Sequence, residues 1–262
     1  NDNSSSIKLI KDTKKYFNNQ MFAKRVVPDY SLLKASGGKT TLEKLKLHVL
    51  KNKNKRVLIE FIKKKTAQEF YKLIKNEVEK NGITVRLMTG DSNIQERKNI
   101  IAELEKINSV ILVATQVIEA GVDIDMDIGY KDISRLDSEE QFMGRINRSC
   151  KGEGIVYFFN LDSARMVYRD GDIRIDEDFT VLKPDMQEIL RTKNFADYYE
   201  EILKIRKRRT KEENENNLEN FFEEKAGRLN YPKVSEKMRL IDDQREMINV
   251  FLSRTLKLAD GE

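Results

Sequence analysis

From residue 55 onward, short apolar runs alternate with amphipathic helical segments, and this alternation constrains the fold more than any other feature of the chain. Each run is rich in Val, Ile, Leu or Phe, has the length of a strand, and recurs roughly every 25 residues. Strands separated by helices predict a parallel, helix-covered sheet, because a right-handed crossover must carry the chain back between parallel neighbours. We therefore expect an α/β fold whose ligand-binding loops follow the strands along one edge. The expected strands are 56–62, 83–88, 110–113, 127–133 and 154–159.

Three segments have the pattern of a capping box, in which a Ser or Thr hydroxyl and a Glu or Gln side chain each bind a free N–H group of the first helical turn. They are 66–69, 92–95 and 138–141, and each predicts the start of a helix. The first helix is expected to end at Asn81 and Gly82, since both residue types tolerate a left-handed backbone.

The composition changes after the last expected strand, and this change predicts further segments. Residues 170–181 are expected to form a hairpin or an irregular excursion, and 184–228 are rich in helix formers and charge. Two short apolar runs, 237–241 and 248–252, predict strands that are too few to form a domain of their own. The expected segments are a basic N-terminal segment (1–54), the sheet domain (55–165), a charged helical linker (166–233) and the start of a C-terminal accessory domain (234–262).

The chain has a single Cys, Cys150, and a single His, His48, and these counts exclude several kinds of chemistry. A disulfide needs two Cys residues, and a structural zinc site needs three or four Cys or His ligands. We expect Cys150 to be an ordinary reduced thiol and His48 a surface or boundary residue. No apolar run reaches the roughly 18 residues of a membrane span, and the polar N-terminus does not have the pattern of a signal peptide. The chain does not begin with Met, so we expect it to be a fragment.

Charge is unevenly distributed along the chain. The net charge is +5, from 49 Lys and Arg against 44 Asp and Glu, but residues 1–60 alone hold 14 basic and 5 acidic residues. A basic segment of this kind is compatible with a polyanionic partner. A lysine-rich solvated surface explains the charge equally well.

Two motifs, Val113–Ile124 and Gln141–Arg148, contain the side chains of half a phosphoryl-transfer site. Thr115 directly follows a buried strand, where its hydroxyl can meet a phosphate, and Gly121 permits a close approach of the backbone. Asp123 is suited to ribose hydroxyls or to an ion pair. We expect Arg145 and Arg148 to share one face of a helix and to present two guanidinium groups to one site.

The other half of such a site is missing from the motifs of this chain. A phosphate loop has the pattern G-x-x-x-x-G-K-[ST], and Gly37–Thr40 matches only its end, because Leu33 stands where the first Gly is required. We expect Gly37–Thr40 to form a flexible or helix-leading loop.

These motifs, together with Leu136–Ser138, resemble motifs V and VI of the superfamily 2 helicases, and more narrowly those of the CRISPR-associated type I helicase–nuclease family. The resemblance extends over about residues 50–165, with a thinner match at Leu240–Asp243 and Val250–Leu252. It implies a parallel-sheet, RecA-like helicase domain, similar to the P-loop NTPases but without the phosphate loop, followed by a helical extension.

The resemblance also implies roles for individual residues. Thr115, Gln116, Thr66 and Thr89 would contact single-stranded DNA. Gly121 and Asp123 would contact the nucleotide. The γ-phosphate would be met by Gln141, Arg145 and Arg148, with Arg148 as the arginine finger. Two positions depart from the family pattern: Phe142 replaces a usual basic residue, and a frequent His is absent from 89–91.

The implied activity is that of an ATP-dependent helicase, with this fragment alone inactive. ATP with Mg²⁺ would be bound mainly by a first RecA-like domain, and no metal site is expected in this chain. The implied partners are single-stranded DNA, the first RecA-like domain and nuclease domain of the same protein, and the CRISPR RNA-guided surveillance complex, in the cytoplasm. The alternatives are an RNA or DNA-repair helicase of the same superfamily, a non-catalytic RecA-like module that binds nucleic acid, and a structural interaction domain.

Each motif residue also has a plainer interpretation. Gln141 can be part of a helix cap, and Thr115 a simple turn residue. Arg145 and Arg148 can pair with Glu139 and Glu140 on a solvated face. The alternating residues Asp123, Asp125 and Asp127 would suggest a cation site on a strand, but the spacing of a calcium loop is not met. The basic run 206–209 is more simply a helix surface than a nucleic-acid contact.

Overall fold

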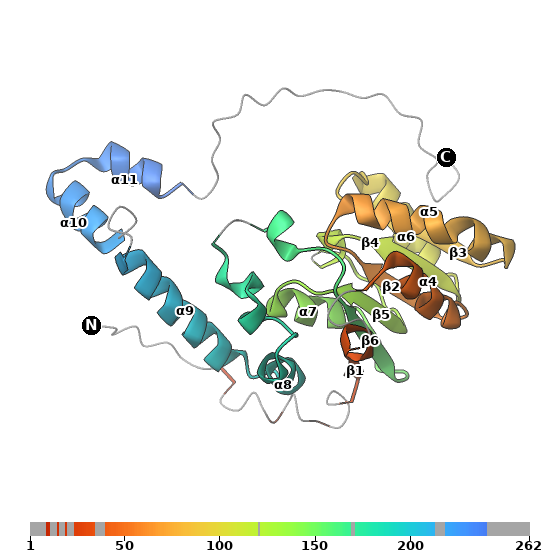
Figure 1. The fold of residues 1–262 in the computed structure, drawn as a ribbon. Helices are drawn as coiled ribbons and strands as arrows, with labels where there is room; N and C mark the ends of the chain where they lie inside the picture. Colours follow the sequence, from red (N-terminus) through yellow and green to blue (C-terminus); the bar gives the residue numbers. More distant parts are fainter. Residues whose placement is uncertain are drawn as a thin grey trace. The chain divides into compact units, whose positions relative to one another are not determined.

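The computed structural model describes residues 9–10, 15, 19, 24–34, 40–119, 121–168, 171–212 and 218–239. Its centre is a six-stranded sheet with the order β1-β6-β5-β2-β4-β3, in which every neighbouring pair is parallel (Figure 1). The predicted α/β class with a parallel sheet is therefore confirmed. The strands are β1 Val26–Asp29, β2 Arg56–Glu60, β3 Thr84–Met88, β4 Val110–Ala114, β5 Ile128–Asp132 and β6 Gly154–Phe159.

Strands β2, β3, β5 and β6 lie within their predicted apolar runs, and β4 extends one residue beyond its run, whereas β1 was not predicted. β1 has only four residues, is half-exposed, and includes Pro28, which restricts a strand to an edge position. It lies at one edge of the sheet and pairs only with β6.

The helices fall in two compact units, one up to Asn194 and a second from Phe195. The first unit contains α3 Ser31–Lys34, α4 Leu42–Lys51, α5 Lys64–Lys80, α6 Ile94–Leu104, α7 Leu136–Met143 and α8 Pro184–Thr192, with short 3₁₀ turns η1 Gln116–Ile118, η2 Ala164–Met166, η3 Ile173–Ile175 and η4 Glu177–Phe179. The second contains α9 Phe195–Glu212, α10 Leu218–Gly227 and α11 Tyr231–Lys237. No helix within the described residues is long and apolar enough to cross a membrane.

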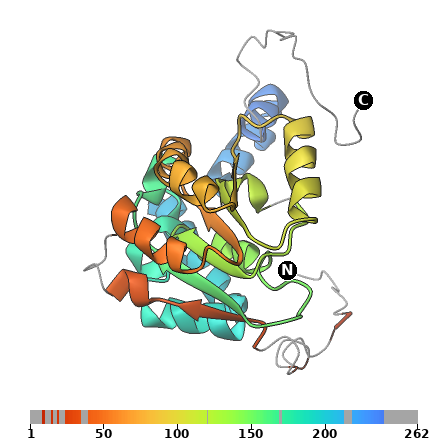
Figure 2. The ribbon, with the colours of Figure 1, turned by 90° about the vertical axis from the view of Figure 1, so that its right-hand side faces the viewer.

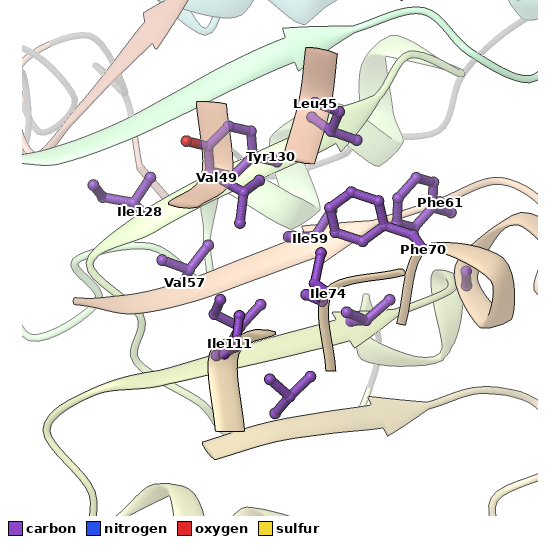
Figure 3. Close-up of a cluster of buried hydrophobic side chains, with 14 of the residues drawn as sticks. Leu45, Val49, Val57, Ile59, Phe61, Phe70, Ile74, Ile111, Ile128 and Tyr130 are labelled. Atoms are coloured by element: carbon purple, nitrogen blue, oxygen red, sulfur yellow. The ribbon is translucent and has the colours of Figure 1, made fainter. Parts of the chain in front are cut away.

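Helices α4 and α5, orange in the figure, lie together on one face of the sheet (Figure 2). Phe70 and Ile74 of α5 point onto Val57 and Ile59 of β2, and none of these four side chains is exposed (Figure 3). Burial of each such side chain stabilises the fold by about 1.5–3 kcal/mol relative to exposure. The helical spacing of apolar residues seen in the sequence is therefore the basis of this core.

The opposite face of the sheet packs against α7. A Cβ atom added at Gly129 of β5 would lie 2.6 Å from a ring carbon of Phe142. Only glycine leaves room for the α7 side chain over this strand, so Gly129 fixes how near α7 lies to the sheet.

Two of the three predicted capping boxes are wrong, and the third is displaced by one residue. Thr66 and Ser138 lie inside α5 and α7, and neither helix has a side-chain cap. The box of α6 is formed by Asn93 and Glu96 instead of 92 and 95. The pattern does not distinguish a helix start from a helix interior, because a hydroxyl residue and a Glu or Gln three residues apart also occur inside amphipathic helices. The predicted end of α5 is confirmed, with Gly82 at φ 73°.

The described segments after the sheet are turns and helices. Residues 171–181 form the irregular excursion, with η3 and η4 and no hairpin. The described part of 184–227 is helical except for Lys193 and Asn194, which separate α8 from α9. A strand at 237–241 is wrong for its described part, since Lys237 ends α11. Residues 248–252 lie outside the described residues, as does most of the loop Gly37–Thr40, while Thr41 caps α4. The predicted four-segment division stays a prediction.

Candidate functional site

Three of the predicted nucleic-acid contacts follow strands at the carboxyl edge of the sheet. Thr115 follows β4 and Thr89 follows β3, and their exposed fractions are only 5% and 4%. The Thr89 hydroxyl accepts the N–H of Asp91 at 3.3 Å, so it supports its own turn. Gln116 begins η1, and its Nε2 donates to the Ile62 carbonyl at 3.0 Å, which ties this turn to the loop after β2. The structure thus brings these residues to one edge but turns their side chains inward.

Three lysines that the motifs do not include also lie at this edge. Lys63 precedes α5, and Lys64 and Lys65 are its first two residues, with side-chain exposures of 31%, 51% and 85%. The helix has neither a side-chain cap nor an acidic residue in its first turn, so its positive end adds to their charge. Thr66 lies one residue further on and is buried. The signal in the sequence was three consecutive lysines directly after a strand.

The two motifs meet at Asp123 and Arg148. A guanidinium nitrogen of Arg148 lies 3.1 Å from Oδ1 of Asp123, and the two side chains are 45% and 83% exposed. Gly121, at φ 71°, lies in the same loop, and nothing is within 4 Å of a Cβ added there. This open surface is formed by the predicted nucleotide residues Gly121, Asp123 and Arg148.

Asp125 fixes the main chain on which Arg148 stands. Its carboxylate accepts the N–H of Arg148 at 2.7 Å and the N–H and hydroxyl of Ser149. Burial alone would raise the pKa of Asp125, but these hydrogen bonds hold it below its ordinary value. The loop after α7 is therefore held to the loop after β4 by a charged acceptor.

The expectation that Arg145 and Arg148 share one face of a helix is wrong, because both residues follow the end of α7. Helix α7 ends at Met143, and Asn147 between the two arginines has a left-handed backbone with φ 44°. The Arg145 guanidinium donates to the carbonyls of Ile118 at 3.0 Å and Glu119 at 2.5 Å. Burial lowers the pKa of the Arg145 guanidinium, and the positive charge of Arg148 lowers it further. Gln141 lies on α7 and is exposed.

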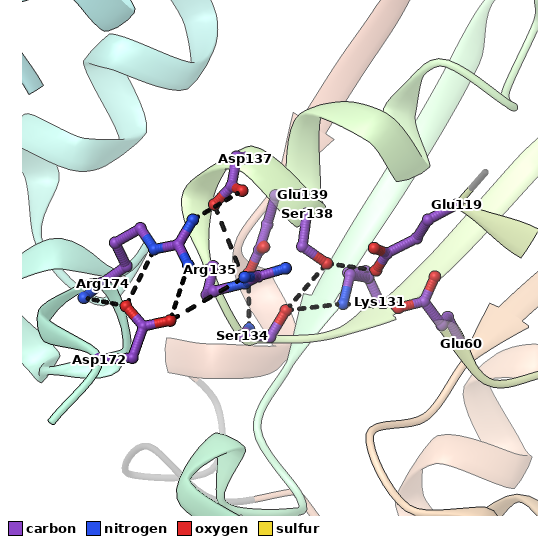
Figure 4. Close-up of polar contacts among 10 residues, drawn as sticks. All are labelled: Glu60, Glu119, Lys131, Ser134, Arg135, Asp137, Ser138, Glu139, Asp172 and Arg174. Atoms are coloured by element: carbon purple, nitrogen blue, oxygen red, sulfur yellow. Dashed lines mark hydrogen bonds and ion pairs between the residues drawn. The ribbon is translucent and has the colours of Figure 1, made fainter. Parts of the chain in front are cut away.

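A buried charged cluster lies at the carboxyl ends of β2 and β5 (Figure 4). Glu60 and Lys131 are register partners on β2 and β5, with 2.8 Å between their charged atoms and no exposure of either side chain. Burial raises the pKa of Glu60 to about 8 and that of Glu139 to about 7. Burial would lower the pKa of Lys131, but Glu60 and its acidic neighbours raise it. The sequence signal was a charged residue inside each of two apolar strands.

Comparison with known proteins shows what the sheet unit is similar to. Residues 53–151 match the family model for the C-terminal part of the CRISPR-associated nuclease/helicase Cas3. The match covers less than half of the chain, and we call these residues the Cas3-like domain. The similarity agrees with the predicted resemblance to this family, and the parallel sheet agrees with the predicted RecA-like fold class. A search of curated protein sequences gave no significant match.

Solved helicase structures are similar to the Cas3-like domain. T. fusca Cas3 with ADP is 17% identical with a TM-score of 0.47, and the match covers 63% of this chain and 23% of that one. The C-terminal domain of the DEAD-box protein Dbp5 is 21% identical with a TM-score of 0.41, over 48% and 72% of the two chains. Domain 2 of the DEAD-box helicase Mss116p, bound to an RNA duplex, is 21% identical with a TM-score of 0.39, over 53% and 54%. The chain thus spans about a quarter of the T. fusca Cas3 chain that it matches.

Several plainer interpretations do not hold in the Cas3-like domain. Glu139 accepts the Ser134 N–H at 2.8 Å and Glu140 pairs with Lys193, so neither pairs with the motif arginines. Asp127 accepts the Arg56 N–H at 2.9 Å, and no described group of three or more His, Cys, Asp and Glu is arranged to hold a metal ion.

The single His and the single Cys of the chain both lie at the boundary between the core and the surface. His48 is half-buried, with Nδ1 2.9 Å from the Tyr130 hydroxyl, and burial, then Lys51, lowers its pKa. Cys150 is a free, half-buried thiol. A cavity of about 370 Å³ lies after β5 and β6, and none of the predicted site residues lines it.

Proposed function

We propose that this chain supplies the second RecA-like domain of an ATP-dependent helicase that moves on single-stranded DNA in CRISPR antiviral defence. The match of residues 53–151 to the Cas3 C-terminal family supports the class, and the meeting of Asp123 with Arg148 carries the proposal. ATP would lie between this domain and a first RecA-like domain, which would supply the phosphate loop and the carboxylates for Mg²⁺.

In this proposal Arg148 is the arginine finger. Its ion pair with Asp123 is exposed, and such pairs contribute at most about 1 kcal/mol, so Arg148 can leave the carboxylate for a γ-phosphate at little cost. Asp123 is then available to the ribose hydroxyls, and Gly121 permits the nucleotide to approach the backbone. Gln141 is exposed on α7 and would meet the γ-phosphate or the attacking water.

The nucleic-acid contacts of this proposal lie at the carboxyl edge. Thr66, Thr89, Thr115 and Gln116 belong to the turns there, and their backbone groups would meet the phosphates together with the exposed ammonium groups that begin α5. Contacts of this kind position a strand without reading its sequence.

The other partners of the proposal would act outside this domain. Mg²⁺ would be held by the first RecA-like domain and the ATP phosphates. The nuclease domain would receive the translocated strand, and the CRISPR RNA-guided surveillance complex would load it, in the cytoplasm.

The test is ATP turnover by the protein that carries both RecA-like domains. Arg148→Ala should lower turnover by about 10³-fold or more, the scale known for arginine fingers, while the affinity for ATP changes little. Arg165→Ala is the matched control, because Arg165 is 67% exposed and pairs with Asp176. Equal turnover of Arg148→Ala and the control would refute the assignment.

The same assay separates the alternatives. Stimulation of turnover by single-stranded DNA supports the proposal, whereas stimulation only by RNA points to an RNA helicase. Binding of nucleic acid without any turnover points to a non-catalytic module.

A further inference from the structure

A chain of buried hydrogen bonds begins at Lys131. The Nζ atom of Lys131 lies 2.8 Å from Glu60 and donates to the Asp132 carbonyl and the Ser134 hydroxyl, each at 3.0 Å (Figure 4). An ammonium group has donors and no acceptor, so Lys131 donates both hydrogen bonds and holds Glu60 as an ion pair. Lys131 therefore acts as a fixed donor at the end of β5.

The chain continues through two hydroxyls to Glu119. Ser134 donates to Ser138 at 3.1 Å, and Ser138 donates to Oε1 of Glu119. Each hydroxyl has one proton, and Lys131 can only donate, so the hydrogen bonds have one direction, from Lys131 to Glu119. Ser134 and Ser138 are 1% and 0% exposed, and hydrogen bonds strengthen one another in such a setting.

Glu119 is held a second time through its main chain. Its carbonyl accepts from Arg145, which also donates to the Ile118 carbonyl. The start of α7 thus binds the side chain of Glu119, and the segment after α7 binds its backbone. Glu119 lies two residues before Gly121, in the loop that leads to Asp123.

We propose that Glu119 is a positioning residue that clamps the loop of Gly121 and Asp123 to α7, with Ser138 and Arg145 as its two partners. The proposal rests on the function proposed above for that loop. Arg145 then holds backbone carbonyls and leaves the γ-phosphate to Arg148. The clamp sets the distance between Asp123 and Arg148 before any nucleotide binds, and a fixed arrangement of this kind is what accelerates transfer reactions.

The first test uses hydrogen–deuterium exchange in the chain itself. Glu119→Ala should speed exchange in 115–124 and 136–148 by about tenfold or more, since it removes a hydrogen bond to a carboxylate. Glu119→Gln keeps an oxygen that accepts from Ser138 and should exchange within about twofold of the unchanged chain. Glu105→Ala is the matched control, because Glu105 is exposed at the end of α6.

Ser138→Ala removes the donor of the same hydrogen bond. It tests the clamp if Glu119→Ala does not fold. Combined with Glu119→Ala, it should add little further exchange in 115–124, because both changes break the hydrogen bond between Ser138 and Glu119. Unchanged exchange in both segments would overturn the proposal. Equal effects of Glu119→Gln and Glu119→Ala would overturn it too, since charge would then matter instead of the hydrogen bond.

The second test is ATP turnover by the protein with both RecA-like domains. Glu119→Ala should lower kcat by about tenfold to a hundredfold with KM for ATP within about threefold, because a misplaced catalytic group slows the reaction more than it weakens binding. Glu119→Gln should restore kcat. An unaltered kcat despite faster exchange would overturn the positioning role. A lack of turnover in the unchanged protein would instead count against the proposed function. The clamp would then be tested by the exchange experiment alone.

Discussion

Replacing Lys131 by Met should destabilise the sheet unit strongly. The side chains of Lys131 and Glu60 are wholly buried with their charged atoms 2.8 Å apart, and Glu139 is also buried close by. Removal of one partner of a buried ion pair costs about 3–5 kcal/mol, because the remaining charge has no partner. We expect a loss of about 3 kcal/mol in the free energy of unfolding at pH 7, since the pKa of Glu60 is already about 8 and its carboxyl can take up a proton.

The loss of unfolding free energy in Lys131→Met should increase as the pH rises. In the folded chain the pKa values of Glu60 and Glu139 lie above the unfolded value of about 4.5, so the folded state holds more protons in the range above pH 5. Stability is then highest at low pH within this range and falls as the carboxyls lose their protons, by about 1 kcal/mol per pH unit for each proton. Without Lys131 the pKa of Glu60 rises further, which extends the fall to higher pH.

The assay is urea unfolding followed by circular dichroism at pH 6, 7 and 8.5. The double variant Glu60→Met with Lys131→Met removes both charges and should recover at least half of the loss, as buried pairs replaced by apolar residues often do. Lys64→Met, at an exposed lysine, should change stability by less than about 0.5 kcal/mol. A cost below about 1 kcal/mol for Lys131→Met at pH 8.5, or no recovery in the double variant, would refute this reasoning.

Two further predictions follow from the packing and from the carboxyl edge. Gly129→Ala places a Cβ 2.6 Å from the Phe142 ring and should cost about 1–3 kcal/mol in the same unfolding assay, whereas Gly90→Ala, with no atom within 4 Å, should not show this loss. Replacing Lys64 and Lys65 together by Ala should weaken binding of single-stranded DNA at low salt, and should lower the slope of log K against log salt by about 1.4, as expected for two lost phosphate contacts. An unchanged slope would show that the DNA phosphates do not contact these two lysines.

The sheet could be predicted because its strands are buried on both faces and therefore appear as apolar runs. β4 is buried at all five positions, and its run was found within one residue. β1 has no such signal, since it is an edge strand with Pro28 and owes its place to pairing with β6. Helix starts were less predictable, because a buried hydroxyl such as that of Ser138 has the same sequence pattern as a cap.

The candidate site could be predicted in its residues but not in its geometry. The motifs named Asp123 and Arg148, which the structure brings together. The direction of Arg145 depends on the end of α7 and on the left-handed Asn147, neither of which the motif spacing contains. The pairing of Glu60 with Lys131 depends on the register of β2 against β5, which only the folded sheet defines.

The central claim is that this domain provides one half of an ATP site. The most direct test is the rate of ATP hydrolysis by the purified 262-residue chain, measured with and without single-stranded DNA. We expect no turnover above background, because the sequence has no match to the full phosphate-loop pattern. Steady turnover that is lost in Arg148→Ala would contradict it, since the chain alone would then hold a complete site.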